Sequence, residues 1–126
     1  MKLDQITDGE LSILQILWER QEAGTREIAE KIYGEVTDPK VATIQKLIER
    51  LESKGCVTRD RSERAHRYRA RVSREKFLRS RLQALADRLC GGAIAPLMTT
   101  LVQSKGLSKS EHAELRKLID EEWPSK

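Results

Sequence analysis

A dense group of arginines in the middle of the chain could neutralise a row of negative charges. Residues 54–81 hold 11 of the 24 Lys and Arg residues, while the segments before and after them are acidic and neutral. The centre of the group is Arg61, Arg64, His66, Arg67 and Arg69. Like charges this close repel one another unless an anion normally lies against them. The pattern therefore favours contact with nucleic-acid phosphates, with a solvated basic surface as the alternative.

Polar side chains on a predicted helix directly before this group could read base edges. We expect Asp38 to cap the helix, Pro39 to be its first residue, and Lys54 and Gly55 to end it. A helix that enters the major groove needs short or flexible polar side chains. The outward residues that meet this need are Lys40, Ala42, Thr43, Gln45 and Lys46, and Arg50 also faces outward as a predicted DNA contact. A solvated helix face is the alternative, and Glu49 and Glu52 favour it for the C-terminal half.

Two more helices are expected before this one. Thr7 and Glu10 have the spacing of a capping box, so the first helix begins there, and its apolar stripe runs to about Gln21. Thr25 caps the second helix, which ends before Gly34, a residue suited to the left-handed position after a helix.

The basic segment itself is predicted to form a hairpin, with strands over 56–61 and 66–72 around a turn at 62–65. Alternation places four residues on its inner side: Val57, Tyr68, Ala70 and Val72. Three helices followed by a basic hairpin are the pattern of a winged helix, in which the third helix enters the major groove and the hairpin follows the DNA backbone. Thr25 and Arg26, at the start of the second helix, complete the predicted DNA contacts.

Residues 73–126 return to helical spacing and predict three further helices, with breaks at Gly91 and Gly92 and near Lys105. Ser108 and Glu111 form a second capping box, and Pro124 stops the last helix. The apolar stripes are too wide for so short a segment to bury, so we expect a second copy of the chain to cover them. The predicted dimerisation residues are Phe77, Leu82, Leu85, Leu89, Leu97, Leu101, Leu115, Leu118 and Trp123.

The expected fold is therefore mainly α with a small β-hairpin. A winged helix-turn-helix DNA-binding domain occupies residues 1–72, and a helical dimerisation region occupies residues 73–126.

The remaining reactive residues form no catalytic or metal-binding pattern. Cys56 and Cys90 lack metal-type spacing and are expected to be buried small hydrophobes, with a regulatory disulfide as the alternative. We interpret Glu111 and His112 as a surface pair and the many Glu/Lys pairs as helix support. No run of about 20 apolar residues could insert into a membrane, and the N-terminus lacks the features of a signal peptide. The prediction is a cytoplasmic protein without metal, cofactor or enzymatic activity.

Five segments together resemble the penicillinase repressor family, the bacterial regulators of β-lactamase and methicillin-resistance genes and their copper-responsive relatives. They are residues 11–18, 25–28, 43–51, 54–55 and 91–92. The resemblance covers nearly the whole chain. It implies a homodimeric repressor on a palindromic operator, with the winged helix on DNA and the C-terminal helices interlocked between subunits.

Two features depart from subgroups of that family. In its proteolytically induced members, a membrane sensor triggers cleavage between an Asn and a Phe in the helix after the paired glycines, and the matching positions here are Thr100 and Leu101. The sequence therefore does not identify a regulatory protease or sensor. The copper-responsive members carry a cysteine-rich tail, whereas no cysteine follows Cys90, so copper sensing is not expected.

The predicted function is a sequence-specific transcriptional repressor that binds a double-stranded DNA operator as a homodimer. One alternative is a winged-helix module that binds protein and never DNA, which would carry an acidic or apolar wing. The other is a nucleotide-processing or metal-dependent enzyme, which would need a phosphate loop or a ligand cluster.

Overall fold

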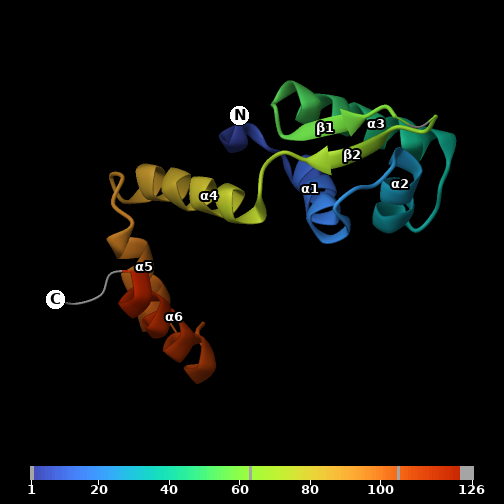
Figure 1. Ribbon diagram of the computed structural model, residues 1–126. Coiled ribbons are helices and arrows are strands. Elements are labelled where there is room, and N and C mark those ends of the chain that lie inside the picture. Colours follow the sequence, from blue (N-terminus) through green and yellow to red (C-terminus); the bar gives the residue numbers. More distant parts are fainter. Residues whose placement is uncertain (1, 63, 105, 123–126) are drawn as a thin grey trace. The chain divides into compact units, whose positions relative to one another are not determined.

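Helices dominate the chain, and one short hairpin lies between two groups of them. The structure, a computed structural model, describes residues 2–62, 64–104 and 106–122. In chain order the elements are η1 (Leu3–Gln5), α1 (Asp8–Arg20), α2 (Thr25–Tyr33), α3 (Asp38–Ser53), β1 (Val57–Asp60), β2 (Arg67–Ala70), α4 (Arg74–Leu89), α5 (Ala95–Gln103) and α6 (Lys109–Glu122) (Figure 1). The predicted fold class, mainly α with a small β-hairpin, is confirmed.

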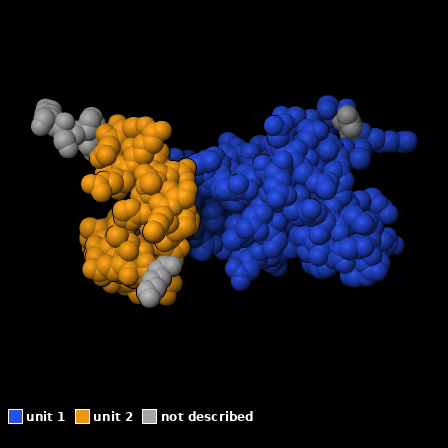
Figure 2. All heavy atoms as spheres, turned by 90° about the horizontal axis from the view of Figure 1, so that it is seen from below, with its two compact units in different colours: residues 1–81 blue, residues 82–126 orange. Residues whose placement is uncertain are grey.

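The chain divides into two compact units, residues 1–81 and 82–126 (Figure 2). The division falls inside α4, so the first turns of that helix belong to the same unit as the hairpin. The predicted boundary after residue 72 concerns the roles of the two regions in binding and dimerisation, and it stays a prediction.

Three helices and the hairpin of the first unit enclose one apolar core. The core side chains with at most 1% exposure on α1, α2 and α3 are Ile13, Leu14, Leu17, Ile28, Ala29, Ile44, Ile48 and Leu51. They recur at intervals of three and four residues, so each helix turns one stripe inward. Truncating one of these Ile or Leu side chains to alanine costs about 2–5 kcal/mol. This packing therefore fixes α2, α3 and the hairpin relative to one another.

The hairpin pairs in the register that alternation predicts. β1 and β2 are antiparallel, with Val57 opposite Ala70 and Asp60 opposite Arg67. Val57, Tyr68 and Val72 are no more than 3% exposed, and Ala70 is half-buried, which confirms the predicted inner side. The strands are shorter than expected, because pairing stops on both sides of the turn at Asp60 and Arg67.

A third extended segment, which the sequence pattern did not predict, lies beside β2. Ala23 exchanges two backbone hydrogen bonds with Tyr68, at 3.1 and 2.9 Å, and so joins the link between α1 and α2 to the hairpin. One paired residue is too short to leave a period-2 pattern. The segment after β2 is joined to α1, because Trp18 Nε1 donates a hydrogen bond of 2.8 Å to the carbonyl of Val72.

Two helix starts lie one residue away from their predicted positions. The N-cap of α3 is Thr37, not Asp38, and its hydroxyl accepts the Lys40 N–H at 3.4 Å. Asp38 lies instead in the first turn, where the helix dipole favours a carboxylate. The N-cap of α2 is Gly24, not Thr25, because the bridge at Ala23 holds the preceding backbone extended.

Other predicted helix boundaries are confirmed. The Thr7 hydroxyl accepts the Glu10 N–H at 3.3 Å at the start of α1. Gly34 ends α2 with φ 75°, a conformation that favours glycine. Ser108 and Glu111 cap α6 reciprocally, each side chain accepting the N–H of the other residue at 3.1 Å.

The second unit contains the end of α4 together with α5 and α6. Gly91 and Gly92, with φ 59° and 94°, terminate α4 at the predicted break. No described residue of α5 or α6 is buried. The predicted roles of Lys105, Trp123 and Pro124 lie outside the described residues.

Candidate nucleic-acid interface

The outward face of α3 presents the side chains expected to reach base edges. Its exposed predicted contacts are Ala42, Thr43, Gln45, Lys46 and Arg50. Thr43 Oγ1 donates a hydrogen bond of 3.0 Å to the Pro39 carbonyl, which holds this side chain in one rotamer. The face is therefore accessible from Ala42 to Arg50.

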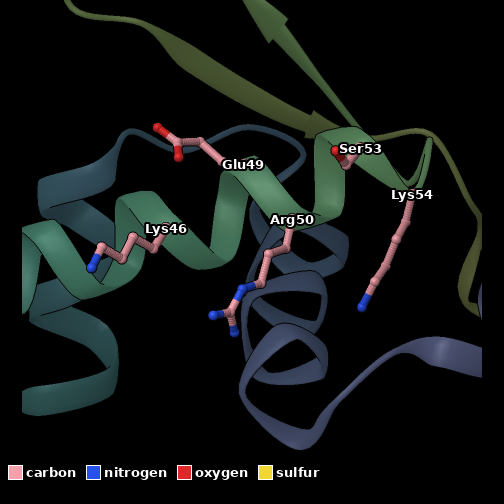
Figure 3. Close-up of a pocket in the computed structure, with 5 residues that line it drawn as sticks. All are labelled: Lys46, Glu49, Arg50, Ser53 and Lys54. Carbon is pink, nitrogen blue, oxygen red and sulfur yellow. The ribbon is translucent and has the colours of Figure 1, made fainter.

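Lys46 and Arg50 border an open hollow on the C-terminal half of α3 (Figure 3). Its volume is about 300 Å³, and Glu49, Ser53 and Lys54 complete its lining. Arg50 and Glu49 point away from each other, so the acidic side chain does not neutralise the basic one (Figure 3). This half of the helix can therefore still contact an anion, although Glu49 and Glu52 had favoured a plain solvated face.

Lys40, at the amino end of α3, is less available than predicted. Its Nζ forms an ion pair with Glu35 and lies 5.5 Å from the ring centroid of Tyr33. Its side chain is 34% exposed. A DNA phosphate would therefore compete with Glu35 for this ammonium group.

A larger hollow of about 420 Å³ lies where the amino end of α2, the face of α3 and the hairpin meet. Its lining residues from the predicted DNA contacts are Thr25, Arg26, Gln45, Arg64, His66 and Arg67. The structure thus brings together residues that are up to 42 positions apart in the sequence, from Thr25 to Arg67. Ala42, Thr43 and Arg61 line neither hollow.

Two of the wing arginines already have carboxylate partners within the chain. Arg67 forms an ion pair with Glu27, and its Nε lies 3.4 Å from a Glu22 oxygen. Arg69 donates two hydrogen bonds to Glu22, at 2.8 and 3.1 Å. Carboxylates of the same chain therefore already offset the charges of Arg67 and Arg69, so these two arginines do not by themselves require an external anion. Sequence spacing could not show this, because the carboxylates lie 40 or more positions away.

The hydrogen bond from Arg67 to Glu27 raises the pKa of the guanidinium, with the nearby charges of Glu27 and Glu22 acting in the same direction. Arg61 and Arg64, by contrast, are exposed and form no ion pair with another described residue. These two arginines, together with His66, are the wing side chains most open to an approaching phosphate.

Strand β1 of the hairpin is held to α3, and the turn that follows it is closed by a local hydrogen bond. Arg59 donates a hydrogen bond of 2.7 Å to Glu52, which raises the pKa of Arg59. The Asp60 carboxylate accepts the Ser62 backbone N–H at 2.9 Å, and this bond lowers the pKa of Asp60. Glu52 therefore has a structural role that sequence reasoning missed.

The interpretation of the many Glu/Lys pairs as helix support is wrong for two of the three Lys–Glu pairs among the described residues, Glu35–Lys40 and Glu10–Lys54, and most ion pairs lie between elements. These pairs connect separate elements: Glu10–Lys54, Glu27–Arg67, Glu22–Arg69 and Glu52–Arg59. Within the described ranges, Lys117–Glu121, at 3.9 Å, is the pair with helical spacing of four. The Glu111 carboxylate caps α6 and forms neither a hydrogen bond nor an ion pair with His112, so the expected surface pair between them is not formed.

The described residues contain no group of three His, Cys, Asp or Glu side chains that could hold a metal ion. Cys56 is fully buried as predicted, and burial raises the pKa of its thiol. Cys90 is only half-buried, so the prediction of burial was wrong there, because the glycines that follow it end α4 and leave this turn open. Among the described helices, none is long and apolar enough to cross a membrane.

Comparison with known proteins gives a consistent set of relatives. The penicillinase repressor from Bacillus licheniformis is 24% identical over 121 residues, which span 95% of this chain and 93% of that protein. The methicillin resistance regulatory protein MecI of Staphylococcus aureus (strain N315) is 25% identical over 119 residues, which span 94% of this chain and 96% of that protein. The solution structure of the DNA-binding domain of the repressor BlaI aligns with 60% of this chain and 90% of its own, at 24% identity and a TM-score of 0.48.

The family model described as penicillinase repressor matches residues 6–121, which include all helices from α1 to α5 and nearly all of α6. A match of this length covers both compact units of the chain. The chain therefore belongs to the penicillinase repressor family, whose members are transcriptional regulators and not enzymes.

Proposed function

We propose that the chain is a sequence-specific transcriptional repressor that binds a palindromic DNA operator as a homodimer. The observation that carries this proposal is the 420 Å³ hollow between α2, α3 and the hairpin. Arg64 and His66 on the wing, Arg26 on α2 and Gln45 on α3 all border it. A surface that combines basic side chains with a helix face fits a duplex, whose phosphates and base edges must be contacted together.

In this proposal the two elements have different tasks. Ala42, Thr43, Gln45 and Lys46 on the exposed face of α3 contact base edges in the major groove. Arg61, Arg64 and His66 on the wing, with Thr25 and Arg26 at the start of α2, contact phosphates. Arg50, which is exposed on the C-terminal half of α3, also contacts a phosphate of the DNA backbone. The helix thus supplies sequence preference and the wing supplies affinity.

The apolar surface of the second unit supports the homodimer. Leu85 is 41% exposed, Leu89 68% and Leu118 50%. Leu82 and Leu101 are also exposed, while Leu97 and Leu115 are half-buried. Monomeric proteins rarely leave so many large apolar side chains in water, and a second copy of the same helices would cover them. Phe77 contributes less, because it is already packed in the first unit at 7% exposure.

A dimer places two winged helices on two half-sites, about 34–36 Å apart when they are separated by one turn of DNA. The region from residue 73 onward would then act in dimerisation and residues 1–72 in DNA binding, as predicted. Because its partner is DNA, we propose that the protein works in the cytoplasm. No metal or cofactor is required for this function.

Selection of bound duplexes from a random DNA pool tests the proposal directly. We expect enrichment of an inverted repeat, and an affinity for the enriched duplex that falls steeply between 50 and 200 mM salt, as phosphate contacts require. A variant with Arg61, Arg64 and His66 replaced by Gln is the matched comparison, because it keeps the α3 face but lacks the proposed phosphate contacts of the wing. A pool without enrichment, combined with affinity that salt does not change, would contradict DNA binding and favour a protein-binding module.

A further inference from the structure

The connection between α1 and α2 and the strand β2 are fastened together by a group of opposite charges. Two carboxylates, Glu22 and Glu27, face three guanidinium groups, Arg20, Arg67 and Arg69. Arg67 lies at the centre, since its Nη1 is paired with Glu27 and its Nε lies 3.4 Å from Glu22. We name this group the wing clamp.

Backbone contacts place the wing clamp at the point where the hairpin meets the body of the domain. Ala23, next to Glu22, forms its two hydrogen bonds with Tyr68, next to Arg67. A Cβ added to Gly24 would lie 3.6 Å from the carbonyl oxygen of His66, so these two segments of the chain lie side by side. Any change in the wing clamp therefore acts where the wing leaves the body.

The three central charges of the wing clamp are only partly exposed, while Arg20 and Arg69 at its margin are 45% and 61% exposed. The side chain of Arg67 is 27% exposed, that of Glu22 35% and that of Glu27 38%. Glu27 is also the third residue of α2, where the helix dipole favours a carboxylate. Both oxygens of Glu27 are engaged, one by Arg67 and the other by Arg20 at 3.6 Å.

We propose that Glu27 is a positioning residue for DNA binding, which holds Arg67 and thereby fixes the wing beside the amino end of α2. In this role Arg67 is an internal support of the wing, while Arg64 and His66 make its phosphate contacts. The inference rests on the proposed function, and it concerns an acidic residue on an otherwise basic surface, where its charge alone should repel DNA.

The two possible effects of Glu27 on affinity have opposite signs. By its charge alone, a carboxylate on a DNA-facing surface weakens binding, so its removal should strengthen binding. As the holder of Arg67, it improves binding, so its removal should weaken binding by leaving the wing free to move. The sign of the measured change therefore separates the two effects.

The experiment measures the affinity of the full chain for a fluorescent random-sequence duplex, long enough for two half-sites, at low salt. We expect Glu27→Gln to bind about twofold to fivefold more weakly, the range of one partly exposed ion pair. Glu30→Gln is the matched control, because Glu30 is an exposed carboxylate of the same helix with no ion pair among the described residues. It should bind equally well or more tightly.

A double-mutant cycle adds a readout that a loss of stability would not move. If Glu27 acts through Arg67, Glu27→Gln should produce no further weakening in an Arg67→Gln background. Urea unfolding of each variant establishes that the domain is folded under the binding conditions. If Glu27→Gln does not fold, Glu22→Gln removes the other carboxylate of Arg67 without changing α2 and should weaken binding in the same way.

Equal or tighter binding by Glu27→Gln would overturn the proposal, and so would losses that simply multiply in the double variant. Either result leaves DNA binding by the unmutated chain intact, so the proposed function stands. Failure of the unmutated chain and of Glu30→Gln to bind the duplex would instead remove the proposed function, and the positioning role with it.

Discussion

Lys54 Nζ lies 2.7 Å from a carboxylate oxygen of Glu10, and this ion pair joins the end of α3 to the start of α1. The Glu10 side chain is 1% exposed and that of Lys54 17%. The same ammonium group donates a hydrogen bond of 2.6 Å to the Gln5 carbonyl, and Thr7 donates its hydroxyl to Glu10 at 3.1 Å. Removal of the lysine would leave a buried carboxylate without a cation.

The first prediction follows from this pair. Lys54→Met should lower the free energy of unfolding of the first unit by about 2–3 kcal/mol, because an uncompensated buried charge remains. This loss is smaller than the usual value for a fully buried ion pair, because the Lys54 side chain is partly exposed. Urea denaturation followed by circular dichroism measures the change. Lys46→Met, an exposed change of the same kind on the same helix, should cost less than about 0.5 kcal/mol. Equal stability of the two variants would contradict the role of the ion pair.

The helices that carry the site could be predicted from the sequence because their signals are local. The stripe of Ile44, Ile48 and Leu51 and the capping residues lie within a few positions of one another. The alternation at Val57, Tyr68 and Val72 likewise gave the inner side of the hairpin. These patterns were sufficient to place the predicted contacts of α3 on an exposed face.

The pairing of charges could not be predicted in the same way. Glu10 was recognised as a capping residue, but its carboxylate is instead directed to Lys54, 44 positions away. Glu27 and Arg67 are 40 positions apart, and neither spacing nor composition indicates which carboxylate an arginine will meet. The predicted N-caps of α2 and α3, Thr25 and Asp38, each lie one residue too late for a similar reason. Neighbouring residues can each cap a helix, and tertiary contacts determine which of them does so.

The second prediction concerns the homodimer. Light scattering at micromolar concentration should give twice the mass of the chain. Leu118→Asp should produce monomers, because it places a charge in the apolar stripe of α6. Ala113→Asp introduces the same residue on the opposite side of that helix and should remain dimeric. A strictly monomeric unmutated chain would contradict the proposed arrangement of half-sites.

The third prediction separates the tasks of helix and wing. Arg64→Ala should weaken binding to all duplexes and reduce the slope of log affinity against log salt by about one, the value for one lost phosphate contact. Lys46→Ala should change the preference among operators by about 1–3 kcal/mol for the base pair it contacts. Binding assays on the selected duplex and on single-base variants of it would measure both. If both variants changed only general affinity, the proposed division would be wrong.

The fourth prediction concerns the buried thiol. Cys56 is fully buried and its pKa is raised, so it should resist a thiol reagent at pH 8 that labels it rapidly in urea. Because the folded thiol has the higher pKa, its contribution to stability is complete below the ordinary thiol pKa and is lost as pH rises through the folded value. Mass spectrometry locates the label, and Cys90 provides a half-buried thiol for comparison. Labelling of Cys56 at the same rate in folded and unfolded protein would contradict its burial.

The last prediction concerns release from DNA. A dimer binds two half-sites together, so separation of its subunits removes an advantage of about 10²- to 10⁴-fold. Thr100 and Leu101 lie on α5, and Leu101 is 42% exposed, so a cut between them would disrupt a helix of the proposed dimer surface. In the proteolytically induced members of the family, the cut falls between an Asn and a Phe, and Thr100 and Leu101 occupy the matching positions in this chain.

Because that pair is absent here, we expect a sensor protease specific for it to leave the chain whole, and induction to use another protease specificity or a ligand in the dimer interface. The chain would be expressed together with such a sensor, treated with its inducer and analysed by mass spectrometry. The double variant Thr100→Asn and Leu101→Phe restores the expected pair in the same helix and should be cut between the two residues. A clean cut after Thr100 in the unmutated chain would contradict the prediction, because cleavage would then not depend on the Asn and Phe side chains.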